Sequence, residues 1–146
     1  MIAKELMGRW SEPVRNVIEE GAVRKFADAT CDPNLLYRDA EYASKTRHRR
    51  RIAPPTFSCT LSYGVVEGLQ IREEGLIHGE QTFHFERPLY IGEEIYCSTR
   101  LADAYSRSGG NGKLTFLIYE QKGETAEGEL IFTARMNVIS KEGVSE

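Results

Sequence analysis

Four segments in the second half of the chain alternate apolar and polar residues, a pattern typical of strands with one buried face. The alternation begins in residues 81–89, where Phe83 and Phe85 point one way while Thr82 and His84 point the other. It returns in residues 93–105, 113–121 and 129–140. The connections at 109–112 and 122–128 are rich in glycine and polar residues, as turns are. The pattern therefore predicts about four consecutive antiparallel strands.

The first half of the chain favours helices instead. After a short extended run that includes Val14 and Val17, residues 21–30 place apolar side chains at helical spacing. Asp32-Pro33 is expected to end this helix, because proline disfavours a helical conformation in the residue before it. Residues 39–45 predict one more helical turn.

The segment Ala53–Gln70 links the two halves and is unusually apolar. Its two prolines suit a helix start, and residues 56–69 contain neither lysine nor arginine. Such a helix would be buried on most sides, and a sheet with one apolar face needs a partner to cover it. The simplest arrangement is an α+β hot-dog fold, in which a curved antiparallel sheet wraps around a long central helix.

Composition is ordinary for one globular domain, which we assign to residues 1–146. Hydrophobic residues make up 40% of the chain and charged residues 28%. No apolar run is long enough to span a bilayer, and the N-terminus lacks the pattern of a signal peptide. Cys31, Cys59 and Cys97 have no metal-ligand spacing, so we expect no metal site and reduced thiols in a cytoplasmic protein. The net charge of −3 disfavours a nucleic-acid partner.

Three stretches carry a resemblance to a known family. They are "FADATCDPNLLYRDAEYA", "IAPPTFSCT" and "HGEQTFHFERPLYIGEE". Together they resemble the MaoC-like, R-specific enoyl hydratase and dehydratase family, and within it the FAS1-like dehydratase N-terminal type, over roughly Glu20 to Ile139. The resemblance implies a hot-dog fold that works as a homodimer or with a second hot-dog chain. It also implies addition or removal of water across the 2,3 double bond of an acyl thioester, on coenzyme A or an acyl carrier protein, without a further cofactor.

The resemblance points to one catalytic loop, with one residue exchanged. Asp32 and Asn34 match the aspartate and asparagine of the family's motif, whereas Tyr37 stands where the catalytic histidine is usual. Family members with this exchange commonly pair with a histidine-bearing chain, which supplies the chemistry while the first chain shapes the acyl pocket.

Hydration of an enoyl thioester needs a base, an acid and donors for the thioester oxygen. Tyrosine has an unperturbed pKa of roughly 10, so Tyr37 is a poor base near neutral pH. Three interpretations of the loop stay open: a catalytic Asp32, a plain turn that stops the helix, or a vestigial pocket position.

Binding roles are expected elsewhere in the chain. The backbone of Ala53, Pro54, Pro55 and Thr56, at a helix start, could hold the thioester oxygen, or could simply begin a core helix. His78 and His84 are possible substitute acids or bases, because histidine titrates near neutrality, although either could be structural. A ligand contact by Gln81 is equally weakly indicated.

The stretch "KTRHRRR", residues 45–51, is the strongest local charge. Arg49, Arg50 and Arg51 could bind coenzyme A phosphates or an acidic carrier protein, because arginine forks suit phosphate geometry. The alternative is a solvated basic loop.

The sequence therefore favours a hydratase or dehydratase component acting on 2-enoyl or 3-hydroxyacyl thioesters. A non-catalytic acyl-binding subunit and a hot-dog thioesterase are the alternatives. No nucleic-acid or membrane partner is expected.

Overall fold

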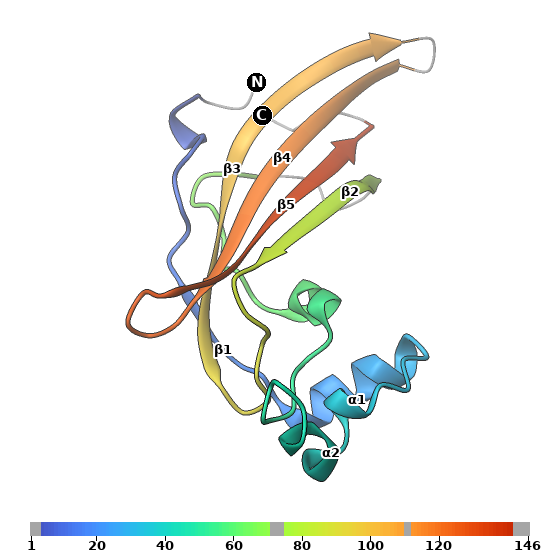
Figure 1. Cartoon of the computed structure of the whole chain (residues 1–146). Helices are drawn as coiled ribbons and strands as arrows, with labels where there is room; N and C mark the ends of the chain where they lie inside the picture. The colour runs from blue at the N-terminus through green and yellow to red at the C-terminus, as the bar shows by residue number, and fades with distance from the viewer. Residues whose placement is uncertain (1–3, 71–74, 110–111, 142–146) are drawn as a thin grey trace.

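Five strands form one curved antiparallel sheet in the computed structural model, which describes residues 4–70, 75–109 and 112–141 (Figure 1). The order across the sheet is β1-β3-β4-β5-β2. The strands are β1 Val14–Val17, β2 Leu76–Phe85, β3 Glu94–Gly109, β4 Gly112–Glu124 and β5 Leu130–Ser140. The four strands predicted from alternation are confirmed, and the short extended run around Val14 becomes the fifth.

The helices are short, and all except the N-terminal 3-10 turn gather toward one end of the sheet (Figure 1). They are α1 Glu20–Ala29 and α2 Ala40–Ser44, with 3-10 turns at Lys4–Leu6, Leu35–Tyr37 and Pro55–Thr60. α1 buries Val23 and Ala27, as its apolar spacing predicted. The turn predicted for residues 39–45 is α2, and its N-terminus is capped by the Asp39 carboxylate, which accepts the Tyr42 N–H.

The long central helix predicted after Pro55 is wrong. Only Pro55–Thr60 is helical, and the backbone is already extended at Leu61. Gly64 and Gly68 have φ angles of +79° and +83°, which a right-handed helix cannot contain. The sheet of the predicted hot-dog fold is present, but a short 3-10 turn followed by irregular chain occupies its concave side.

Close approach of two backbones explains why the chain leaves helical geometry here. A Cβ atom on Gly64 would lie 2.8 Å from the carbonyl oxygen of Glu12. The Ser11 hydroxyl donates to the carbonyl of Tyr63 at 2.7 Å and accepts the N–H of Thr99 at 3.0 Å. Residues 61–64 are therefore tied to the N-terminal segment and to β3.

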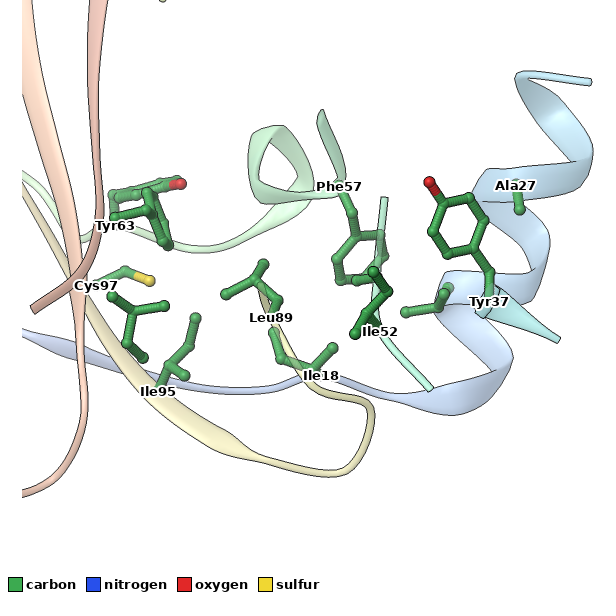
Figure 2. Packing of buried hydrophobic residues seen from close by; sticks show 13 residues of the cluster. Ile18, Ala27, Tyr37, Ile52, Phe57, Tyr63, Leu89, Ile95 and Cys97 are labelled. Carbon is green, nitrogen blue, oxygen red and sulfur yellow. The ribbon is translucent and has the colours of Figure 1, made fainter. Parts of the chain in front are cut away.

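The main core fills the space between the sheet, α1 and the 55–60 turn (Figure 2). Ile18, Leu89, Ile95 and Phe132 are almost fully buried in it. Burial of each such side chain contributes about 1.5–3 kcal/mol. Phe57 joins α1 to this core through an edge-to-face contact with Phe26, with ring centroids 5.6 Å apart.

The aromatic ring of Phe132 lies directly against the backbone of Gly123, its neighbour on β4. A Cβ atom at position 123 would stand 2.2 Å from the ring. Phe85 and Tyr63 flank the same ring, with centroids 5.2 and 6.4 Å away. Gly123 is therefore required so that Phe132 can pack on the concave face.

The two edge strands differ in how far they are covered. Beside β1, the Asn16 amide donates to the carbonyl of Ser62 at 2.8 Å and accepts its N–H at 2.9 Å. β2 pairs with β5 on one side, and no other described strand pairs with its outer edge. An uncovered edge of ten residues is a ready template for pairing with another chain.

Within residues 4–70, 75–109 and 112–141, no helix has the length and apolarity needed to cross a membrane.

Gly123→Ala should destabilise the protein by about 1–3 kcal/mol, because Phe132 must move away from the new methyl group. Gly21→Ala is the matched control, since its Cβ would meet only the Glu19 carboxylate at 3.5 Å within a helix. The control should be neutral or slightly stabilising. Urea unfolding of both variants checks this, and equal midpoints would contradict the packing described.

Alkaline pH should also weaken the fold. Burial raises the pKa of the Cys97 thiol from 9.0 to about 12. The unfolded chain then loses this proton first, so the free energy of unfolding should fall as pH rises between those two values, by up to about 1.4 kcal/mol per pH unit. Cys97→Ala should make that slope shallower, whereas Cys31→Ala, at an exposed position, should leave it unchanged. Unfolding curves across this pH range measure the slopes.

Candidate functional site

The loop after α1 is built by its own polar side chains. Cys31 adopts a φ of 54°, which turns the chain away from the helix. The Asp32 carboxylate accepts the N–H of Asn34 at 3.0 Å, and the Asn34 side-chain oxygen accepts the N–H of Leu36 at 3.0 Å. Such side-chain-to-backbone bonds stabilise turns. Asp32 and Asn34 thus have a structural task, whatever else they do.

Tyr37 lies at the end of this loop and is 8% exposed, inside the core cluster. Its ring stands between α1 and the 55–60 turn, in the neighbourhood of Phe57 (Figure 2). Burial raises the pKa of the phenol above 10.0, the Asp32 charge raises it further, and a hydrogen bond from Asn34 opposes both. The three predicted catalytic residues therefore interact, and Tyr37 is a hydrogen-bond donor at neutral pH and not a base.

Arg38 anchors the loop, a role that the sequence did not indicate. Its guanidinium pairs with the Asp28 carboxylate at 2.6 Å and donates to the carbonyl of Asp32 at 3.0 Å. A cation directly after the motif was the available signal, but only the fold shows that α1 and the loop supply its two acceptors.

Residues 53–56 offer an oxyanion fewer free backbone N–H groups than we expected. The Ala53 N–H is already donated to the carbonyl of Leu89 at 2.8 Å, and Pro54 and Pro55 have no N–H. Among the described residues none accepts the N–H of Thr56. The long helix whose dipole was expected to help is absent, so any stabilisation rests on that one amide.

The three candidate residues on β2 have different surroundings. The Gln81 side-chain oxygen lies 3.7 Å from the thiol sulfur of Cys59, so this residue reaches the 55–60 turn. Cys59 itself is exposed. His78 is exposed beside a bulge in β2, and His84 pairs with Glu86 at 3.1 Å on the outer face. The structure does not bring either histidine into contact with the Asp32 loop.

The basic stretch is partly neutralised. Arg51 pairs with Glu20 at 2.6 Å, and this lowers the pKa of the Glu20 carboxyl. Arg50 stacks on Tyr90, with its guanidinium carbon 4.4 Å from the ring centroid. Arg49 is exposed, and no described residue pairs with it. Arg49 and Arg50 are therefore the better placed to receive an anion.

An apolar chamber of about 330 Å³ lies between the irregular segment and the concave face of the sheet. Val66 and Leu69 form one wall, while Met136, Val138 and Tyr119 form the other. It exists because the chain from Leu61 to Leu69 is not helical. Gly64 and Gly68 were the sequence signal that this segment is not helical. The apolar composition of the segment nevertheless led us to expect a continuous helix.

A second hollow, about 630 Å³, is on the opposite face of the sheet, beside Trp10. Its acidic residues are already paired: Glu120 with Arg100 at 2.6 Å and Arg135 at 3.1 Å, and Glu124 with Lys122 at 2.9 Å. Among the predicted site residues only His84 lines it, and none of them lines the apolar chamber. An apolar chamber with few polar groups is the more usual setting for an acyl ligand than a row of satisfied ion pairs.

Comparison with known proteins gives consistent results. Residues 5–134 match the family model described as FAS1-like, dehydratase domain region. A UPF0336 protein of Thermobifida fusca is 34% identical over 140 residues, which cover 91% of this chain and 90% of the relative.

Solved structures share the fold at low identity. The truncated HadBC (3R-hydroxyacyl-ACP dehydratase) complex of Mycobacterium tuberculosis contains a chain with a TM-score of 0.79 and 19% identity, covering 92% of this chain and 97% of that one. The R-hydratase PhaJ1 of Pseudomonas aeruginosa has a TM-score of 0.71 and 21% identity, covering 94% and 83%. The hot-dog fold predicted from the sequence is thereby confirmed.

Because the matched model spans nearly the whole sheet and the loop of Asp32, the chain belongs to the FAS1-like dehydratase domain region family.

Proposed function

We propose that this chain is a component of a hydratase or dehydratase that acts on 2-enoyl or 3-hydroxyacyl thioesters of coenzyme A or an acyl carrier protein. Membership of a dehydratase-region family supports the reaction class. The observation that carries the proposal is the apolar chamber on the concave face, because its lining of valine, leucine, methionine and tyrosine side chains suits an acyl chain.

The chamber has the chemistry of an acyl pocket. Its walls are aliphatic and aromatic, and Thr99 and the phenol of Tyr119 are the hydroxyl groups beside them. Burial raises the pKa of Tyr119 to about 12, so that phenol stays neutral and does not oppose an apolar ligand. The volume of about 330 Å³ lies at the small end of ligand pockets, roughly 300–1,000 Å³.

The loop supplies hydrogen-bond donors and a carboxylate, but it has no histidine to act as a base at neutral pH. Tyr37 keeps its proton at neutral pH, and Asp32 is engaged with the backbone of Asn34. Attack of water on C3 of an enoyl thioester needs a group that takes its proton. We therefore assign Asp32 and Tyr37 to positioning, and the proton transfer to a histidine on a second hot-dog chain.

Two features support such a partner. The outer edge of β2 is open for strand pairing. The structurally similar HadBC protein is a complex of hot-dog dehydratase chains. We propose the same kind of assembly here, in the cytoplasm, where the three free cysteines would stay reduced.

The polar end of the substrate would then meet the remaining candidates. The free N–H of Thr56, with Gln81 near by, is proposed to face the thioester oxygen. Arg49 and Arg50 would receive phosphate groups or acidic residues of the carrier.

A non-catalytic acyl-binding subunit is the second candidate, and the exchange to Tyr37 favours it. No observation favours the thioesterase, since no serine or cysteine is set beside a base in the described residues.

Purified alone, the chain should bind crotonyl-CoA or decenoyl-CoA but hydrate neither. Hydration should appear when a hot-dog chain with the Asp-x-Asn-Pro-x-His pattern is added, because that chain brings the base. Loss of absorbance of the conjugated enoyl thioester measures the reaction. Binding without turnover in every mixture would leave the acyl-binding subunit, and release of free coenzyme A would point to the thioesterase.

Tyr37→Phe should weaken binding of the thioester by roughly 2- to 10-fold, the value of one hydrogen bond. Binding to the wild type should stay constant from about pH 6 to about pH 9, because the raised pKa keeps the phenol protonated there. Tyr42→Phe is the control, since Tyr42 is 46% exposed on α2. Calorimetric titration gives both affinities, and equal values for the two variants would remove Tyr37 from the site.

A further inference from the structure

The outer face of the sheet carries a row of acceptors beside the open edge. The acceptors Asp103, Asn137 and Glu80 follow one another across the sheet, with the apolar Ile118 between Asp103 and Asn137. A hollow of about 280 Å³ lies beside this row, and its lining includes Glu80, Asn137 and Ile118 but not Asp103. This hollow is separate from the concave chamber, and the proposed reaction does not use it.

Asn137 has a buried acceptor without a donor. Its side-chain oxygen is shielded from solvent, and no described group donates to it. The bulge of β2 packs over it, since a Cβ on Gly79 would lie 3.6 Å from the Asn137 Cγ atom and 3.3 Å from its carbonyl oxygen. An unsatisfied buried acceptor destabilises the fold, so a donor supplied by a partner chain would offset that loss.

The charges at the two ends of the row are also uncompensated. No described cation pairs with Glu80 or Asp103, and the Asp103 carboxylate accepts only the N–H of Ala104, at 2.8 Å. Arg135 borders the hollow, but it already pairs with Glu120 at 3.1 Å. The neighbouring carboxylates Glu120 and Glu124 are paired, which sets this row apart from the others on the same face.

One kind of chemical group can satisfy both the Asn137 oxygen and the Glu80 carboxylate. A guanidinium or ammonium group has only donors and a positive charge, so it can bond the Asn137 oxygen and pair with Glu80. Ile118 and Tyr105 give its aliphatic stem an apolar surface.

The open edge of β2 indicates where such a group comes from. A strand paired with β2 would place every second side chain on the outer face, next to Glu80. Gly79 has no side chain to block the way across the bulge. β2 itself, "LIHGEQTFHF", contains neither lysine nor arginine, so a second copy paired through the same strand offers no guanidinium or ammonium group from it.

We infer that the Glu80–Asn137 hollow is a socket for a lysine or arginine side chain on the edge strand of a different hot-dog chain. This inference rests on the proposed two-chain enzyme and selects a heteromeric assembly over a homodimer. It adds a specificity contact on the face opposite the acyl chamber.

The test uses the full chain and a hot-dog chain that carries the Asp-x-Asn-Pro-x-His pattern. Calorimetry would compare wild type, Glu80→Gln, Asn137→Leu and the control Glu86→Gln, whose carboxylate is on the same face of the β2 segment but pairs with His84. Glu80→Gln and Asn137→Leu should each weaken association at least 10-fold, and the control less than 2-fold. Unfolding midpoints check that each variant is folded, and Glu80→Gln decides the matter if Asn137→Leu is not.

A stable homodimer of the chain alone, the absence of a complex, or equal effects of Glu80→Gln and Glu86→Gln would overturn the inference. Hydration assays on the same mixtures separate the two proposals. An active complex that is insensitive to Glu80→Gln would refute the socket and retain the enzyme. An inactive complex whose association is weakened by Glu80→Gln would refute the enzyme and retain the socket.

Discussion

The contact between Gly64 and the backbone of Glu12 is the constraint on which the rest of the structure depends. With 2.8 Å between a hypothetical Cβ and the Glu12 carbonyl, only glycine fits, and its φ of +79° prevents a helix from continuing. Ser11 fastens the neighbouring Tyr63 carbonyl, and the Tyr63 hydroxyl donates to the carbonyl of Ser58 at 2.7 Å. The segment after Thr60 is thus held near the N-terminal strand, and the chamber against β3, β4 and β5 stays open.

Hydrogen bonds to the backbone also fix the loop that carries Asp32. The Asp32 and Asn34 side chains accept N–H groups of the loop backbone, and Arg38 donates to the carbonyl of Asp32, so the loop is held by its own hydrogen bonds. Rigid placement suits a residue that orients a ligand, whereas a base needs a pKa near the working pH. The raised pKa of Tyr37 supports the proposal that this residue orients a ligand and does not act as the base.

Sequence periodicity predicted the strands well because alternation at Phe83, Phe85 and their successors reports directly on which face is buried. It predicted α1 for the same reason, through Val23 and Ala27. It failed for residues 61–69, where small apolar residues suit a helix equally well and only the long-range contact of Gly64 excludes one. Local pattern cannot contain that contact, because its two partners lie far apart in the chain.

The candidate site likewise has features that the sequence could predict and features that it could not. The mutual placement of Asp32, Asn34 and Tyr37 follows from their closeness in sequence and was predictable. The pairing of Arg51 with Glu20, the approach of Gln81 to Cys59 and the unsatisfied Asn137 depend on tertiary structure and were not.

Methyl NMR spectra of the chain during titration with decanoyl-CoA test the central claim, that the acyl chain occupies the space left by the missing helix. The account predicts saturable shifts of Val66, Met136 and Val138, with Leu130 and Ile77 on the outer face unchanged. Shifts confined to the outer face, or unaltered chamber methyls at saturating thioester, would contradict it.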